Sequence, residues 1–166
     1  MSPSGVLLEM RGIRKAFGST VALDGVDFTV RRGEVHGLIG ENGAGKSTLM
    51  KVLSGALEAD AGEMSLDGQP YKPGHSAAAR RLGVAMIYQE LTLAPHLSVE
   101  DNIALGLEKG PLSLLHRSRL RPRICEIFSV LRRPDVQPTR RVGDLSVGAQ
   151  QMVEIARALF ADAKII

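Results

Sequence analysis

The chain has 166 residues, of which 44% are hydrophobic, and its formal net charge is +3. This length is enough for one domain with a sizeable core, and no apolar stretch approaches the ~18 residues that a membrane-spanning helix needs. The chain has no Trp, 4% aromatic residues and one cysteine, Cys125, so we expect no nucleic-acid partner and no internal disulfide, as suits a reducing cytosol.

Hydrophobic alternation predicts the first elements. From Leu7 to Phe17, apolar and charged residues are interleaved, which predicts a strand. Residues Val21 to Val30 alternate in the same way but are interrupted at Asp24-Gly25, which is a hairpin-like signal. After a turn, the apolar run from Val35 to Ile39 predicts a strand that leads into a glycine-rich stretch.

The glycine-rich stretch fits the pattern G-x-x-x-x-G-K-[ST] at every fixed position and lies between a predicted strand and a predicted helix. Its residues are Gly40, Glu41, Asn42, Gly43, Ala44, Gly45, Lys46, Ser47 and Thr48. Glycines let the backbone turn tightly and point successive N–H groups inward, and the start of the following helix adds a partial positive charge. The pattern therefore predicts a polyphosphate site, with Lys46 at the β- and γ-phosphates and the Ser47 hydroxyl on Mg²⁺.

Two other interpretations of this stretch are weaker. A chance glycine turn before a helix would not require a lysine and a serine in this order. A dinucleotide-binding fingerprint needs a third Gly or Ala where the chain has Thr48, and it has no use for Lys46 and Ser47.

The elements that follow alternate between helix and strand. A helix is predicted from Lys46 to about Leu57, a short strand from Glu63 to Asp67, and an Ala-rich helix from His75 to Leu82. The continuous apolar run from Val84 to Tyr88 is typical of a strand that is buried on both faces of a parallel sheet.

The pattern becomes helical after Gln89. Ser98 is expected to cap a helix, because acidic residues occupy its first turn. An amphipathic helix is predicted from Arg119 to Arg133, although Pro122 limits its start. A further helix is predicted from about Asp144 to Phe160, and another apolar run begins at Ala163.

Two of these stretches, together with the phosphate loop, resemble one family. The segment from Tyr88 through Gln89 to Asn102 resembles the Q-loop of ATP-binding-cassette (ABC) ATPases. The stretch from Leu145 to Gln151 resembles their signature motif, LSGGQQQ, from which Val147 and Ala149 differ. The motif sequences are most similar to those of the ATPases of bacterial monosaccharide importers of the ribose, galactose or arabinose type. Such ATPases usually carry two cassettes in one polypeptide.

The resemblance covers the chain from Leu7 to Ile166 as the front part of one cassette, and it implies a fold. That fold is α/β: a P-loop NTPase core with a mixed or parallel sheet, an N-terminal antiparallel β portion and an inserted α-helical subdomain, incomplete at the C-terminus. We therefore expect one truncated ATP-binding domain over residues 1–166. Its nucleotide-binding core would comprise residues 1–90 and 145–166, and its helical subdomain residues 91–144.

The resemblance also implies a role for each matching residue. Phe17 would stack on the adenine ring of ATP, the amides of Gly43 to Lys46 would hold the β-phosphate, and Thr48 would touch the α-phosphate. Gln89 would ligate Mg²⁺ or orient the attacking water. Ser146 and Gly148 would grip the γ-phosphate bound to a second cassette. Lys46 and Gln89 would thus be the catalytic residues, and Ser47 and Gln89 the metal ligands.

Some elements of the family's catalytic machinery are not found in the 166 residues. The family continues with an apolar strand that ends in Asp-Glu, whose start resembles Ala163 to Ile166. The later switch histidine is also missing, because the four histidines precede the signature stretch. We expect this polypeptide by itself to have negligible turnover and to be a marginally stable fragment.

The resemblance implies an ATP-binding subunit, an ABC-type ATPase that couples ATP binding and hydrolysis to sugar uptake. Its partners would be ATP with Mg²⁺, membrane-spanning permease subunits and a second cassette, at the cytoplasmic, inner face of the cell membrane. Three alternatives are an ATP-binding module without turnover, a cassette protein acting on DNA or ribosomes, and a phosphate-loop small-molecule kinase. The kinase would leave Leu145 to Gln151 unexplained, and the cassette protein acting on DNA or ribosomes would predict insertions or basic arms that are not visible.

Overall fold

The computed structural model describes residues 5–105 and 117–166. The chain divides into two compact units, one up to Leu82 and one from Gly83 onward, and each unit is described by itself. In the described ranges, no helix has the length and apolar character required to cross a bilayer.

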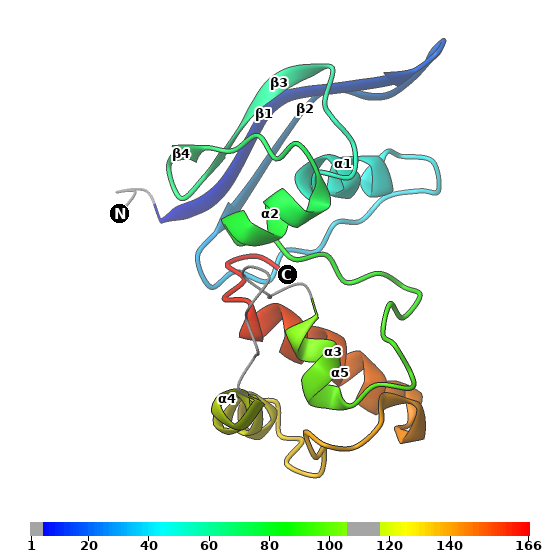
Figure 1. The fold of residues 1–166 in the computed structure, drawn as a ribbon. Helices are drawn as coiled ribbons and strands as arrows, with labels where there is room; N and C mark the ends of the chain where they lie inside the picture. The colour runs from blue at the N-terminus through cyan, green and yellow to red at the C-terminus, as the bar shows by residue number, and fades with distance from the viewer. Residues whose placement is uncertain (1–4, 106–116) are drawn as a thin grey trace. The chain divides into compact units, whose positions relative to one another are not determined.

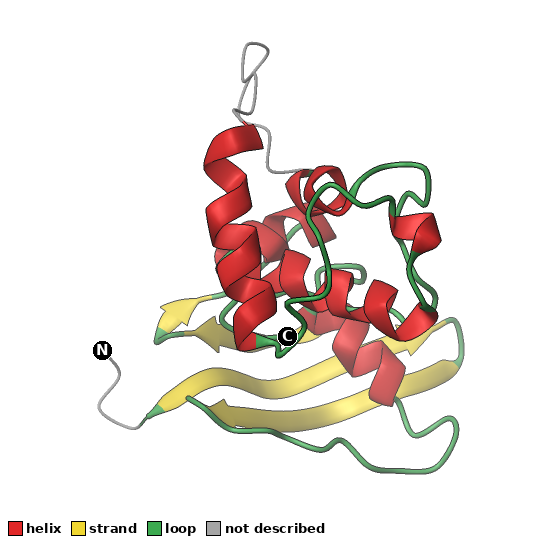
Figure 2. Cartoon of the chain, turned by 90° about the horizontal axis from the view of Figure 1, so that it is seen from below, coloured by secondary structure: helices red, strands yellow, loops and turns green. Residues whose placement is uncertain are grey.

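The first unit is built on a four-stranded antiparallel sheet with the strand order β2-β1-β3-β4. Its two long strands run side by side (Figures 1 and 2). The strands are β1 Val6–Phe17, β2 Thr20–Arg31, β3 Ala61–Leu66 and β4 Gln69–Pro70. β1 is central and buries Leu8, Met10 and Ile13 completely, so the alternation that predicted this strand is confirmed.

β2 differs from its prediction at Asp24-Gly25. The strand continues through this point and pairs with β1 along its whole length, with shifts of register on either side. Gly25 has a φ of 68°, which a residue without a Cβ adopts at little cost and which is typical of a bulge. The predicted hairpin break was therefore wrong: the reversal lies between Phe17 and Thr20, and Gly25 marks an irregularity inside a strand.

Two helices belong to this unit, α1 Lys46–Leu53 and α2 Ser76–Leu82. α1 ends at Leu53 rather than near Leu57, because Gly55 takes a φ of +69° and closes the helix. The amide of Gly55 donates to the Val52 carbonyl and that of Ala56 to the Lys51 carbonyl, which is the Schellman pattern of a glycine-terminated helix.

The predicted strand from Val35 to Ile39 is not formed. Residues 34–40 have no regular secondary structure, and no strand of the described residues pairs with them. The side chains of Val35 and Ile39 are 99% and 95% exposed. An apolar run becomes a strand when a neighbouring strand satisfies its backbone groups, and such a neighbour does not flank this segment within the described part of the chain.

The second unit is a cluster of helices. They are α3 Val99–Ala104, α4 Arg117–Val130, the short 3₁₀-helix η1 Val142–Asp144, and α5 Val147–Phe160. α3, α4 and α5 pack on one another around a core to which each contributes, including Val99, Ile103, Ile124, Phe128 and Val153. Ser98 caps α3, as predicted, by accepting a hydrogen bond from the amide of Asp101.

The predicted strand from Val84 to Tyr88 is formed only at its first residue. Val84 makes an isolated parallel bridge with Ile165, and the amide of Ala85 donates to the Ile165 carbonyl at 2.9 Å. Met86 and Tyr88 are 38% and 44% exposed, so the expectation of a strand buried on both faces was wrong beyond Val84. The start of a parallel pairing is nevertheless present inside this unit.

Candidate functional site

The candidate phosphate loop, Gly40 to Thr48, leads directly into α1 in the first unit. The amide of Ala44 donates to the Glu41 carbonyl at 3.2 Å, which closes a turn. Gly43 and Gly45 have φ values of 88° and 85°, a region that residues with a Cβ rarely enter. Successive amides in such a conformation converge on one side of the chain, which is the geometry of an anion-binding nest.

Gly45 is also required by packing. A Cβ at this position would lie 2.5 Å from the carbonyl oxygen of Ala22 and 2.9 Å from Leu23 Cδ2. β2 therefore presses against the start of α1 and fixes the place at which the loop becomes helix. At Gly43, by contrast, a Cβ would meet no atom within 4 Å, so only the backbone conformation favours glycine there.

The Lys46 side chain folds back across the loop. Its ammonium group donates to the carbonyl of Gly40 at 2.6 Å and to the carbonyl of Glu41 at 2.7 Å. These two bonds tie the start of the loop to the start of the helix. An ammonium group has three donors, so the arrangement leaves one N–H for a further acceptor.

The first turn of α1 has no side-chain cap, since Gly45 occupies the N-cap position and makes no side-chain hydrogen bond. Uncapped amides, the positive end of the helix and Lys46 together form a set made entirely of donors, which fits a polyphosphate. Ser47 is exposed at this turn and Thr48 is half-buried, so the Ser47 hydroxyl is accessible as a ligand for Mg²⁺. No cluster of three or more His, Cys, Asp or Glu side chains gathers elsewhere in the described ranges to hold a metal ion.

Phe17 lies at the end of β1, next to the turn into β2, and its side chain is 49% exposed. The ammonium of Lys15 lies 5.8 Å from the centre of its ring, within the range of a cation–π contact. Phe17 and the loop from Gly40 to Thr48 therefore belong to the same unit, and the β1–β2 hairpin that carries Phe17 also contacts Gly45.

Gln89 belongs to the second unit and is exposed in a segment without regular structure. The segment is anchored on both sides of it. Ala85 is bonded to Ile165, and three residues after Gln89 the amide and hydroxyl of Thr92 both donate to Glu154 Oε1, at 2.9 and 2.8 Å. Gln89 is thus held on a short span between two fixed points.

Sequence reasoning missed Glu154, whose side chain is 9% exposed on α5. It connects the helix that follows the signature-like stretch to the segment that follows Gln89. The signal that might have identified it is an acidic residue between Val153 and Ile155, on the apolar face of a predicted helix, because a buried carboxylate requires hydrogen-bond partners.

The signature-like stretch begins α5. Ser146 is the N-cap, and its hydroxyl accepts a hydrogen bond from the amide of Ala149 at 3.4 Å. Gly148 is exposed, and a Cβ there would meet no atom within 4 Å. The side-chain amide of Gln150 supports the turn by donating to the carbonyls of Val142 and Leu145, each at 3.1 Å. This helix start thus presents Ser146 and Gly148 to solvent on a supported turn.

Comparison with known proteins shows the family to which the chain is similar. The sequence profile of the ABC transporter family matches residues 23–166. The chain is 50% identical over 160 residues to the ribose import ATP-binding protein RbsA 1 of Rubrobacter xylanophilus. The aligned residues make up 96% of this chain and 32% of that protein. It is 46% identical over 163 residues to the arabinose import ATP-binding protein AraG of Chromohalobacter salexigens, covering 98% and 33%. The chain spans about a third of the length of these curated relatives.

Solved structures give the same fold. The chain is similar to a nucleotide-free ATP-binding cassette from an ABC transporter, with a TM-score of 0.77, 29% identity, and coverage of 95% of this chain and 66% of the other. An ATP-binding cassette in its ADP conformation gives a TM-score of 0.76 with the same identity and coverage. The fold of the present chain is therefore that of a P-loop NTPase cassette of the α/β class. Because the family profile matches most of its length, the chain belongs to the ABC transporter family.

Proposed function

We propose that the chain is part of the ATP-binding subunit of an ABC importer, and that it holds Mg-ATP at the loop from Gly40 to Thr48. The observation that carries this proposal is the donor set of that loop: two glycines at positive φ, an uncapped helix start and the Lys46 ammonium beside them. Within this set, the amides of Gly43 to Lys46 bind the β-phosphate, Lys46 binds the β- and γ-phosphates, and Thr48 binds the α-phosphate.

The remaining site residues complete the proposal. The Ser47 hydroxyl and the Gln89 amide are the ligands proposed for Mg²⁺, which when bound neutralises charge on the β- and γ-phosphates. Phe17 stacks on the adenine ring. Ser146 and Gly148, at the exposed start of α5, contact the γ-phosphate held by a second cassette, since a helix start is itself an anion site.

A sugar is the proposed cargo, because relatives that are 46–50% identical over almost the whole chain carry the names of ribose and arabinose import proteins. We further propose membrane-spanning permease subunits and a second cassette as partners, at the cytoplasmic face of the membrane. The core of the cassette is proposed as residues 1–90 and 145–166, with residues 91–144 as the helical subdomain that docks on the permease.

Nucleotide binding by the 166-residue chain tests the loop assignment. Calorimetric titration with Mg-ATP should show binding that Lys46→Ala weakens about tenfold to a hundredfold, because a hydrogen bond from a charged group contributes about 1.5–3 kcal/mol. Lys51→Ala is the matched control, since Lys51 is an exposed lysine of the same helix. Equal affinities of wild type and Lys46→Ala would remove the assignment.

A second candidate function is an ATP-binding module without turnover. It is favoured by the donor set of the loop from Gly40 to Thr48, because such a set can hold a polyphosphate by itself, whereas phosphoryl transfer to water also needs a residue that orients the attacking water. Phosphate release measured on the same preparation distinguishes the two candidates. Binding without release favours the module, and release at a rate abolished by Lys46→Ala favours the ATPase.

A further inference from the structure

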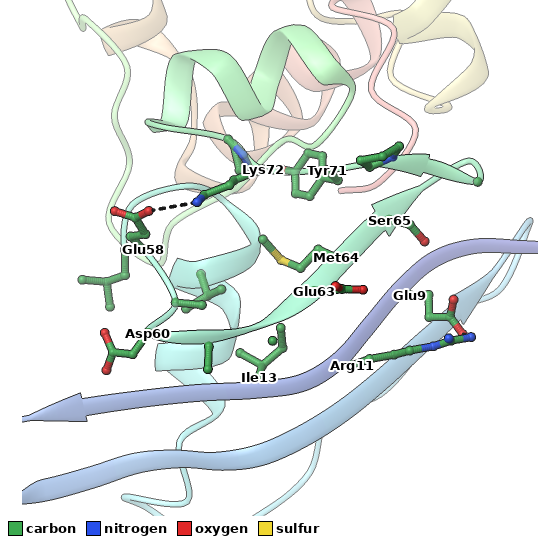
Figure 3. A pocket seen from close by; sticks show the side chains of 18 residues that line it. Glu9, Arg11, Ile13, Glu58, Asp60, Glu63, Met64, Ser65, Tyr71 and Lys72 are labelled. Atoms are coloured by element: carbon green, nitrogen blue, oxygen red, sulfur yellow. Dashed lines mark hydrogen bonds and ion pairs between the residues drawn. The ribbon is translucent and has the colours of Figure 1, made fainter.

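One acidic residue, Asp60, is hydrogen-bonded to the end of β1 that carries Phe17. Its Oδ2 atom accepts a hydrogen bond from the amide of Ala16 at 2.7 Å, and its Oδ1 atom accepts one from the Lys15 ammonium at 2.6 Å. Its own amide donates to the Arg14 carbonyl at 2.9 Å. Three successive residues of β1 are therefore bound to one residue of another segment, which Figure 3 shows beside the end of that strand.

The Lys15 side chain transmits this anchor to the ring. It is only 16% exposed, and its ammonium lies over the Phe17 ring, 5.8 Å from the centroid, while it is bonded to Asp60. The hydrogen bond from Lys15 and, after it, the one from Ala16 lower the pKa of the Asp60 carboxyl. The carboxylate therefore keeps its charge, and its hold on Lys15, at neutral pH.

Phe17 belongs to the same hairpin that contacts the start of α1 at Gly45. In the β1–β2 pairing, Lys15 is opposite Leu23 and Phe17 is opposite Thr20. Leu23 is also one of the residues that press against Gly45. Phe17 is therefore two strand residues, or about 7 Å, from the level at which the hairpin meets the loop.

We propose that Asp60 and Lys15 are positioning residues for a nucleotide base that stacks on Phe17. Asp60 holds the Lys15 side chain in place, and Lys15 restricts the rotation of the Phe17 ring. The base therefore stacks on a ring whose side chain is already ordered. A preordered surface costs a ligand less entropy on binding. The base would be the purine of a nucleoside triphosphate, and the inference in this respect rests on the proposed function.

The test separates the base from the phosphates by using two ligands, Mg-ATP and magnesium tripolyphosphate, on the full chain. Asp60→Asn and Phe17→Ala should each raise the Kd for ATP by about threefold to tenfold, the range expected for one aromatic contact. The Kd for tripolyphosphate should change by less than about twofold, because it has no base to stack. A purely structural role for Asp60 would weaken both ligands in parallel, and this result would overturn the proposal.

Two further variants sharpen the comparison. Glu58→Gln is the matched control, because Glu58 is a carboxylate two residues away whose partner, Lys72, is 85% exposed (Figure 3); it should leave both Kd values unchanged. Lys15→Arg keeps a cation that can bond to Asp60 and cover the ring, so it should retain the ATP affinity that Lys15→Met loses. A melting curve for each variant shows that it is folded under the assay conditions.

The outcomes distinguish this inference from the proposed function. If Phe17→Ala or Asp60→Asn leaves ATP binding unchanged while Lys46→Ala weakens it, the positioning role is overturned and the phosphate site stands. If the wild-type chain binds neither ligand at millimolar concentration, both are overturned together.

Discussion

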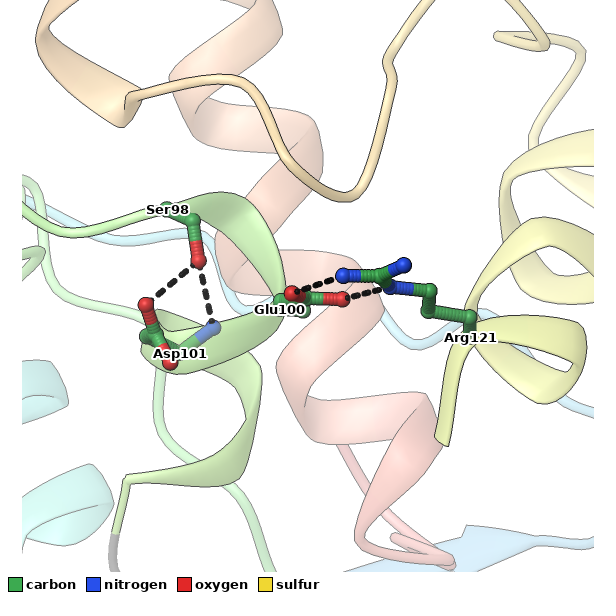
Figure 4. A network of polar contacts seen from close by, with 4 residues as sticks. All are labelled: Ser98, Glu100, Asp101 and Arg121. Carbon is green, nitrogen blue, oxygen red and sulfur yellow. Dashed lines mark hydrogen bonds and ion pairs between the residues drawn. The ribbon is translucent and has the colours of Figure 1, made fainter. Parts of the chain in front are cut away.

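The carboxylate of Glu100 in α3 receives two hydrogen bonds from the guanidinium of Arg121 in α4, at 2.7 and 2.9 Å (Figure 4). Glu100 is 4% exposed, so Arg121 supplies hydrogen bonds that water cannot supply to this buried side chain. Hydrogen bonding and attraction by Glu100 raise the pKa of Arg121. The pair joins α3 to α4, which also share the apolar core that includes Val99, Ile103, Ile124 and Phe128.

Arg121→Ala should therefore destabilise the chain, because it leaves a buried carboxylate without its partner. We expect a loss of about 2 kcal/mol in the free energy of unfolding, measured by denaturant titration. Arg133→Ala is the matched control, since Arg133 pairs with Asp135, whose side chain is 63% exposed; its loss should be under about 1 kcal/mol. Equal losses for the two variants would show that burial of Glu100 does not matter.

The two glycines of the phosphate loop should respond differently to a methyl group. Both have a positive φ, which costs a residue with a Cβ about 1–2 kcal/mol. At Gly45 the new Cβ would also meet the Ala22 carbonyl at 2.5 Å, whereas at Gly43 it would meet nothing. Gly45→Ala should lower the melting temperature clearly more than Gly43→Ala. A larger effect at Gly43 would contradict the packing of β2 against the loop.

The buried carboxylate of Glu154 should be coupled energetically to Thr92. Glu154→Ala leaves the amide and hydroxyl of Thr92 without their acceptor, so we expect a loss of about 2–3 kcal/mol in unfolding free energy, with a smaller loss for Glu154→Gln. Hydrogen exchange at the Thr92 amide should accelerate in the alanine variant.

A double-mutant cycle with Thr92→Val measures the coupling directly, and about 1 kcal/mol is expected. Glu126→Ala, which removes an exposed glutamate from α4, is the control and should stay within about 0.5 kcal/mol. Strict additivity of the two changes would disprove the contact.

The buried hydroxyl of Tyr71 should make the free energy of unfolding fall at high pH. Its hydroxyl donates to the Leu53 carbonyl at 2.7 Å, and burial raises its pKa to about 12. In the unfolded chain the pKa is about 10. Because the folded pKa is the higher one, the stabilisation is complete below pH ~10 and is lost as the pH rises from about 10 towards 12.

Ultraviolet titration of tyrosinate should show a late step that is absent in Tyr71→Phe. The unfolding free energy of this variant should also depend less on pH in the same range. An unchanged titration curve would mean that Tyr71 is not the buried phenol.

The features that the sequence predicted well are determined by residues that are adjacent in the sequence. Ser98 and Ser146 cap α3 and α5 through bonds to amides three residues ahead, which is a local property of serine before a helix. The glycines of the phosphate loop were likewise predictable, because a positive φ is needed at fixed positions of the pattern.

The parts that were not predicted depend on residues distant in sequence. The run from Val35 to Ile39 has the composition of a strand, but a strand exists only with a partner, and composition does not state which partner is present. Asp60 and Lys15 are 45 residues apart, so neither periodicity nor a turn signal connects them. The burial of Glu154 required knowledge of which face of α5 meets the segment after Gln89.

The bridge between Val84 and Ile165 has a practical consequence for engineering. The amides of Lys164 and Ile165 both donate to the Gly83 carbonyl, at 2.7 and 3.1 Å, so the two ends of the segment 83–165 lie next to each other. A module with adjoining ends can be transplanted into a surface turn of a host protein without stretching it, or rejoined there as a circular permutant. Residues 83–166 thus offer a portable piece, whose retention of helical signal in a foreign scaffold can be read by circular dichroism.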